Sequence, residues 1–178
     1  MKRETIKISY SALCLCLALL LPLLTGGVKV FGKMINPMHI AIFLCGLSCG
    51  AVYGAIIGAI APLLRSVIFG MPTLFPSAVG MAFELCAYGL FSGLFFKLFY
   101  NKKCGVYISL ILAMLIGRIV WGITTLVLWR FMGDVFTFAL FIKGAFVDSV
   151  VGIAIQLIII PIIIHALKRA NLLFITKT

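Results

Sequence analysis

The stretch that decides the fold runs from Asn36 to Gly89 and reads NPMHIAIFLCGLSCGAVYGAIIGAIAPLLRSVIFGMPTLFPSAVGMAFELCAYG. It is almost continuously apolar from Met38 to Phe69. A single helix of that length would measure about 48 Å, well beyond the ~30 Å thickness of the hydrocarbon layer. We therefore predict a break within it, at Val52-Tyr53-Gly54. The prolines and glycine of Gly70–Pro76 predict a turn before the next apolar segment.

Small residues recur along this stretch at the spacing of one helical turn. Gly46, Gly50, Gly54 and Gly58 are each four residues apart, with alanines beside them. Small residues at this spacing allow helix backbones to approach closely in lipid. We predict that they pack two neighbouring helices tightly together.

The composition indicates a membrane protein. Hydrophobic residues make up 64% of the 178 residues and charged residues only 11%, which exceeds the apolar share of a soluble domain. We predict a single integral membrane domain over residues 1–178. The net charge of +11 gathers between the apolar segments. This distribution is typical of membrane topology and does not predict binding to nucleic acid.

The cysteines do not predict a disulfide or a metal site. Five of the six lie within apolar segments, where a free cysteine behaves as a small hydrophobic residue. Cys45 and Cys49 are one helical turn apart, but no histidine or carboxylate pair accompanies them. We therefore expect neither a metal nor a cofactor.

Four further apolar segments complete the predicted bundle. They run from Ile8 to Leu24, from the proline-rich turn to Phe99, from Gly105 to Trp129, and from Phe138 to Leu167. The sequence thus predicts an all-α membrane protein, a bundle of six transmembrane helices, with a kink at Pro161 in the last helix. Basic residues near both termini and at 97–103 place both termini in the cytoplasm by the positive-inside rule.

Four of these helices carry ionisable side chains in the outer half of the membrane under this topology. An isolated charge in hydrocarbon costs roughly a few kcal/mol, so these groups must pair or face a wet cavity. Arg65 and Arg118 can balance Glu84 and Asp148 and simply tie the helices together. Alternatively, the paired groups surround a solute pocket that opens to the outside. Both interpretations remain open, and we favour the pocket.

The residues around the predicted pocket indicate the kind of solute. The cations Arg65, Arg118 and Lys143 favour a small molecule with an acidic group. Aromatic side chains suit a flat ring by stacking; these are Phe83, Tyr88 and Trp121. The loops Gly26–Asn36 and Gly70–Pro76 are candidate lids. The complete set of predicted substrate-binding residues is Asn36, His39, Arg65, Glu84, Tyr88, Arg118, Trp121, Lys143 and Asp148.

An ordered set of motifs resembles a known family of membrane proteins. The motifs are PMH at the start of the second helix, PLLRS followed by FGMP and LFP, MAFEL with a later YG, and GRIVWG in the fifth helix. The set is strongest from Pro37 to Gly122. It is similar to the substrate-binding S components of energy-coupling factor (ECF) transporters.

The resemblance implies a transport function with specific partners. An S component captures a vitamin or similar micronutrient from outside, in the cytoplasmic membrane of a bacterium. It then docks on a membrane coupling subunit, the T component, which two cytoplasmic ATPases drive. The family's docking pattern, AxxxA on the first helix, corresponds here to Ala12 and Cys16. Cysteine replaces the second alanine but is still small, and packing within the chain is the alternative interpretation.

Two other classes of function compete with transport. An intramembrane hydrolase needs its nucleophile and base in contact, but Ser48 and His39 lie about 13 Å apart along one helix. The chain also has no HExxH motif and no Walker loop for ATP phosphates. We therefore do not expect an enzyme. A ligand-free membrane scaffold or regulatory protein remains the alternative to a transport subunit.

Overall fold

The computed structural model describes residues 2–25, 37–102, 104–133, 137, 142, 144, 149–170 and 172–174. Within these residues all regular structure is helical, which confirms the predicted all-α class. The helices are α1 (Lys2–Thr25), α3 (Pro37–Cys49), α4 (Ala51–Phe69), α5 (Val79–Leu98), α6 (Gly105–Met132) and α8 (Val150–Arg169), with a π-helical turn η1 (Leu74–Ala78) before α5.

The helices differ in their capacity to cross a membrane. Five of the described segments, all except α3, are long and apolar enough to span the hydrocarbon layer. The prediction of six helices therefore agrees with the described elements, but α3 is too short to be counted as a full span. With 13 residues it rises about 20 Å, against a hydrocarbon thickness of about 30 Å.

The break between α3 and α4 lies at Gly50, so the prediction of Val52-Tyr53-Gly54 was wrong. Gly50 has a φ of 108° and a ψ of 169°, a conformation that is essentially restricted to glycine. Gly54 lies inside α4, where it serves close packing instead. A Cβ atom on Gly54 would lie 2.7 Å from both the Gly46 Cα and the Gly89 carbonyl oxygen.

The small residues form a seam between α4 and α5, as predicted for tightly packed neighbours. A Cβ on Gly58 would meet the backbone of Leu85, and a Cβ on Gly89 would meet the backbone of Gly54. The two backbones are therefore in direct contact along this seam. No residue larger than glycine fits these positions unless the helices separate.

The short helix α3 lies at the centre of the bundle. It packs against α1, α4, α5 and α8, and every one of its residues except Leu44 is buried. The longer helices around it expose large apolar side chains such as Val67 and Ile123. This arrangement, with apolar surface facing outward, fits a protein surrounded by lipid.

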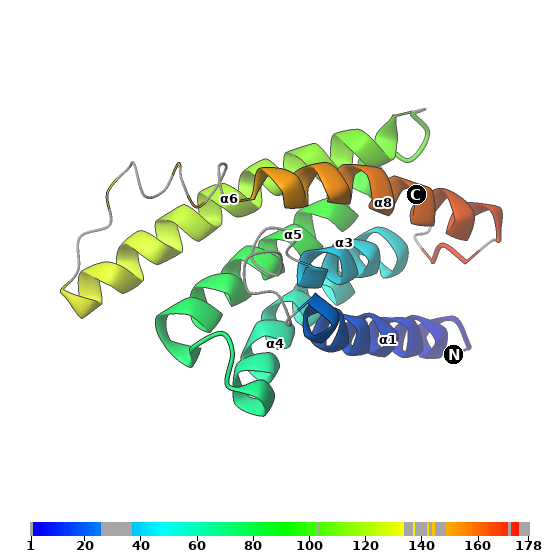
Figure 1. The fold of residues 1–178 in the computed structure, drawn as a ribbon. Coiled ribbons are helices and arrows are strands. Elements are labelled where there is room, and N and C mark those ends of the chain that lie inside the picture. Colours follow the sequence, from blue (N-terminus) through cyan, green and yellow to red (C-terminus); the bar gives the residue numbers. More distant parts are fainter. Residues whose placement is uncertain are drawn as a thin grey trace.

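Both ends of the chain lie at the same end of the bundle. Figure 1 shows the start of α1 and the end of α8 on one side, with the α4–α5 turn and the end of α6 on the other. The Tyr53 hydroxyl donates to Glu4 Oε2 at 2.9 Å and joins the start of α4 to that of α1. The backbone N–H of Phe174 donates to the Ser48 carbonyl at 2.9 Å. We call this the terminal end, and the other the distal end.

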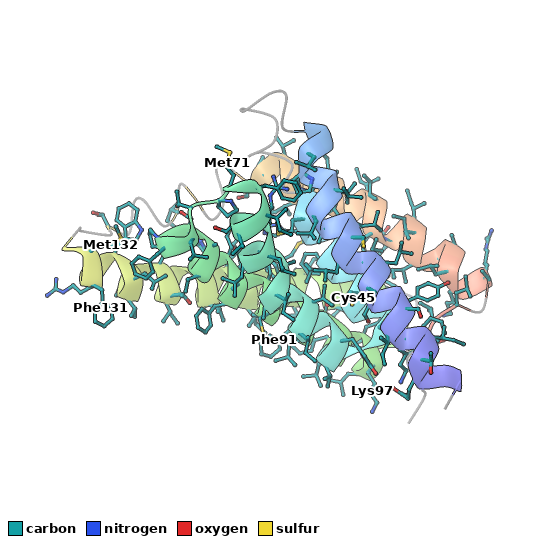
Figure 2. The ribbon with its side chains drawn as sticks, turned by 90° about the horizontal axis from the view of Figure 1, so that it is seen from below. Cys45, Met71, Phe91, Lys97, Phe131 and Met132 are labelled. Atoms are coloured by element: carbon teal, nitrogen blue, oxygen red, sulfur yellow. The ribbon has the colours of Figure 1, made fainter. Side chains whose placement is uncertain are left out.

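The ends of several helices differ from the prediction. Helix α1 already begins at Lys2, so it includes the polar residues before Ile8, where the predicted segment began. An ion pair of 2.7 Å between Lys7 and Glu4 supports this first turn. Helix α6 continues beyond Trp129 to Met132; Figure 2 shows Phe131 and Met132 at the distal end, away from Lys97 at the terminal end.

The structure describes only the later part of the last predicted helix. Helix α8 begins at Val150 and passes through Pro161 to Arg169, two residues beyond the predicted end. Most of residues 138–149, where the prediction began this helix, lie outside the described part of the chain.

Candidate functional site

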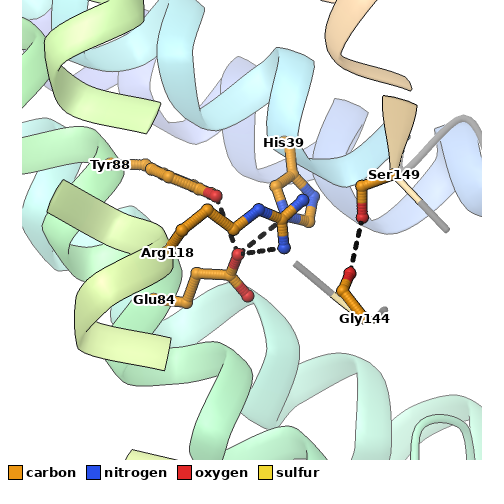
Figure 3. Close-up of polar contacts among 6 residues, drawn as sticks. All are labelled: His39, Glu84, Tyr88, Arg118, Gly144 and Ser149. Atoms are coloured by element: carbon orange, nitrogen blue, oxygen red, sulfur yellow. Dashed lines mark hydrogen bonds and ion pairs between the residues drawn. The ribbon is translucent and has the colours of Figure 1, made fainter. Parts of the chain in front are cut away.

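A cluster of polar side chains lies where α3, α5 and α6 meet. Arg118 Nη1 donates to Glu84 Oε1 at 2.8 Å, and the Tyr88 hydroxyl donates to the same oxygen at 2.8 Å. Glu84 is 2% exposed and Arg118 is 8% exposed. The buried carboxylate and guanidinium therefore compensate each other's charge, as a pair in lipid must. Figure 3 shows their convergence on one carboxylate oxygen.

His39 completes this cluster without a hydrogen bond of its own. Its Nε2 lies 3.8 Å from Glu84 Oε1, beyond hydrogen-bond distance. His39 is only 4% exposed, and neither ring nitrogen has a hydrogen-bond partner in the described part of the protein. Because buried polar groups are nearly always satisfied, this open imidazole marks the cluster as a place where a ligand or water belongs.

The local sequence places these groups together. Glu84 and Tyr88 are four residues apart on α5, so they lie on the same face of the helix. A Cβ on Gly117 would overlap the ring of Tyr88, so this glycine allows α6 to approach α5 closely enough for the ion pair. The Tyr88 ring lies against Phe43 at 4.9 Å and against His39 at 5.4 Å. Tyr88 therefore orients both the carboxylate and the imidazole.

A cavity of about 340 Å³ lies beside the same two helices. Its lining is Pro76, Ser77, Gly80, Met81, Trp121, Thr125, Leu128 and Trp129. Gly80 is one turn from Glu84 on α5, and Trp121 is one turn from Arg118 on α6, both toward the distal end. The polar cluster therefore lies about one turn, ~5.4 Å, below the cavity. Its volume falls in the range of about 300–1,000 Å³ that is usual for small-molecule sites.

The ring of Trp121 contacts the segment that precedes α8. A Cβ on Gly144 would lie 2.8 Å from the edge of this ring, and the Ser149 hydroxyl donates to the Gly144 carbonyl at 3.1 Å. Figure 3 shows this second contact beside the Glu84–Arg118 pair. Gly144 therefore lies close to the wall of the cavity that Trp121 lines.

Arg65 has a different environment from Arg118. Its Nη1 donates to the Leu19 carbonyl of α1 at 3.0 Å, and its guanidinium lies 5.6 Å from the centre of the Phe69 ring. Pro22 has no N–H to give to the Ala18 carbonyl, which weakens the hydrogen bonding of this turn of α1. Arg65 therefore binds the backbone of α1 next to a proline, and is not joined to Glu84.

The structure brings some of the predicted site residues together and leaves others apart. His39, Glu84, Tyr88 and Arg118 form the polar cluster, and Trp121 lines the cavity. Phe83, considered for ring stacking, is 56% exposed and does not line this cavity. Asn36, Lys143, Asp148 and the predicted lid at Gly26–Asn36 lie outside the described residues.

Several cavity residues were missed by the sequence reasoning. Gly80, Thr125 and Trp129 line the cavity but were not predicted as site residues. Their spacing was informative: Gly80 precedes Glu84 by four residues, and Thr125 follows Arg118 by seven. Both offsets return to the same helix face, so a search along the faces of the charged residues would have found them.

The predicted docking residues lie on an outward face of α1. Ala12 and Cys16 are both exposed, whereas Cys14 and Ala18 on the opposite face belong to the core. The alternative interpretation, packing of Ala12 and Cys16 within the chain, does not agree with their exposure.

Comparison with known proteins identifies the family. No curated protein and no solved structure matches the chain. The family described as "ECF transporter, substrate-specific component" matches residues 7–164, which is most of the chain and includes the cluster and the cavity. The members are substrate-binding subunits of membrane transporters and not enzymes. The chain therefore belongs to the substrate-specific components of ECF transporters.

Proposed function

We propose that this protein captures a small, vitamin-like solute in the cavity between α5 and α6 and delivers it through an ECF complex. The observation that supports this proposal most is the position of the polar cluster directly below the cavity. A purely structural ion pair needs no cavity beside it, and His39 would not be left without a hydrogen bond. The Glu84–Arg118 pair and the open imidazole lie about one turn (~5.4 Å) from the cavity lining, and Trp121 and Trp129 in that lining offer rings for stacking.

We also propose that the distal end faces the outside of a bacterial cytoplasmic membrane and that both termini are cytoplasmic. The described basic residues at the terminal end are Lys2, Arg3, Lys7, Lys97, Lys102, Lys168 and Arg169, whereas Arg130 lies at the distal end of α6 and Arg65 about one turn from the distal end of α4. The positive-inside rule places the more basic end in the cytoplasm. The cavity then opens toward the outer half of the membrane.

Filling the cavity should abolish solute binding without damaging the fold. A Cβ on Gly80 would meet only Leu128 and Thr125 side-chain atoms at 3.8 Å, an ordinary contact. Gly80→Ala should therefore be tolerated, whereas the larger side chain of Gly80→Leu should occupy the cavity. We expect Gly80→Leu to reduce the amount of co-purified small molecule by roughly tenfold or more, a loss of at least ~1.4 kcal/mol. Mass spectrometry of the detergent-solubilised protein measures this amount.

Gly80→Ala serves as the matched control for this experiment. It should keep both the thermal unfolding midpoint and the solute content of the wild-type protein. Equal solute content in Gly80→Leu would place the solute elsewhere. If the wild-type protein carries and binds no small molecule at all, the alternative of a ligand-free scaffold or regulatory protein is the better explanation.

The proposed partners are a membrane T component and two cytoplasmic ATPases, and we assign Ala12 and Cys16 to the docking surface. Replacing both with leucine should prevent close approach of a partner helix and reduce co-purification of the complex severalfold. The control is Ala154→Leu with Ala166→Leu, which adds similar bulk to exposed positions of α8. Solute binding by the isolated protein should survive both double changes. Equal losses of the complex in the two variants would exclude a specific role for this face of α1.

A further inference from the structure

The hydrogen-bonding groups left open in the polar cluster indicate which solute it recognises. All the contacts that the described residues make with the Glu84 carboxylate use Oε1. Within the described residues, Oε2 is therefore left as an acceptor. Arg118 contributes Nη1 to the ion pair, and no contact with another described residue uses its other N–H donors. A carboxylate paired with a guanidinium in this way presents an acceptor and a donor side by side.

His39 adds a second group that can both donate and accept a hydrogen bond. A neutral imidazole has one N–H donor and one acceptor nitrogen, and neither nitrogen of His39 is used. The ring belongs to α3, and its Nε2 lies 3.8 Å from Glu84 Oε1. The cluster thus offers donors and acceptors together, and not a row of donors alone.

The charges of the described cluster cancel. Arg118 carries one positive charge and Glu84 one negative charge, and they are in contact at 2.8 Å. Of the other two cations considered for the site, Arg65 is bound to the Leu19 carbonyl and the Phe69 ring, and Lys143 lies outside the described residues. A carboxylate or ammonium group on the solute would bring into this buried place a charge that no described residue of the cluster balances, which is costly.

We propose that the site recognises an uncharged, planar ring that carries a cyclic amide edge, an N–H beside a C=O. The ring N–H donates to Glu84 Oε2, the ring carbonyl accepts from Arg118, and His39 hydrogen-bonds to a polar atom next to this edge. The remainder of the ring extends toward Trp121 in the cavity. This inference rests on the proposed function and replaces the acidic solute that the cations alone suggested.

Small probe molecules test this inference on the purified full-length protein. The probes are 2-pyridone, which has the amide edge; N-methyl-2-pyridone, which lacks the N–H; benzoate, which is an anion; and benzylamine, which is a cation. Ligand-observed NMR with the protein in detergent should show saturation transfer to 2-pyridone that is several times stronger than to the other three. Gly80→Leu should abolish this signal, which assigns it to the cavity.

The variant His39→Phe separates recognition from stability. It keeps an aromatic ring against Tyr88 but removes both nitrogens, so no hydrogen bond in the described structure is lost. Its thermal unfolding midpoint should equal or exceed that of the wild type. Binding of 2-pyridone should weaken about three- to tenfold, which corresponds to about 0.7–1.4 kcal/mol for the loss of one hydrogen bond.

Three results would overturn the inference. These are stronger binding of benzoate or benzylamine than of 2-pyridone, binding of no probe, or undiminished binding of 2-pyridone by His39→Phe. None of them would contradict the proposed function, because the solute content of the Gly80→Leu protein tests that separately. Binding of 2-pyridone that Gly80→Leu leaves intact would likewise place the amide site outside the cavity and contradict the inference, whereas loss of the co-purified solute in the same variant would still support the proposed function.

Discussion

Arg118→Leu is expected to lower the free energy of unfolding by about 3–5 kcal/mol, because it leaves the Glu84 carboxylate buried without its cation. Glu84 is 2% exposed, so water cannot replace the lost charge. Thermal unfolding in detergent measures the loss. The double variant Arg118→Leu with Glu84→Gln should regain much of the stability, since the neutral amide oxygen still accepts the hydrogen bond from Tyr88.

Solute affinity distinguishes the two roles of Arg118. If Arg118 also contacts the solute, affinity should fall roughly tenfold or more, and the second substitution should not restore it. Arg65→Leu is the comparison, because Arg65 is only partly buried and bonds to a backbone carbonyl; its effect on stability should be smaller. A stable Arg118→Leu protein with unchanged affinity would show that Arg118 does not contact the solute.

The sequence predicted the helices better than it predicted their breaks. Long apolar runs and glycine spacing are local signals, so the helical class, the α4–α5 turn and the tight glycine packing could be predicted and are confirmed. The break at Gly50 could not be distinguished from one near Gly54, because both positions carry glycine. Only the packed structure shows that Gly50 needs a positive φ, whereas Gly54 needs space for Gly46 and Gly89.

The candidate site was predictable as a set of buried charges but not as a geometry. The cost of a charge in lipid showed that Glu84 and Arg118 needed partners, and the structure pairs them with each other. The sequence placed Arg65 nearer the end of its helix than Arg118 but did not show that the two have different partners. The structure shows the difference: Arg65 bonds to the Leu19 carbonyl of α1, which is far from it in the chain, whereas Arg118 bonds to Glu84. The lack of a hydrogen-bond partner for His39 among the described residues also depends on interatomic distances, which the sequence pattern does not show.

The glycine seam leads to the second large effect. Gly89→Ala should lower the free energy of unfolding by about 3 kcal/mol, the upper end of the usual cost of overpacking. Its new Cβ would overlap the Gly54 carbonyl and lie 2.8 Å from the Ala55 nitrogen. These are backbone atoms, so no side chain can rotate away and α4 must separate from α5. Thermal unfolding in detergent measures the loss.

Gly80→Ala is again the matched control, because it makes the same chemical change on the same helix. Both substitutions replace glycine with a better helix former, which alone favours the folded state by up to about 1 kcal/mol. Gly80→Ala meets no close contact and should be neutral or slightly stabilising. The difference between the two variants therefore measures the packing of the seam. Equal unfolding midpoints would show that α4 and α5 are not in backbone contact.

Because Gly89 lies on the helix that carries Glu84, a displaced α5 should also weaken solute binding in Gly89→Ala, whereas Gly80→Ala should bind normally.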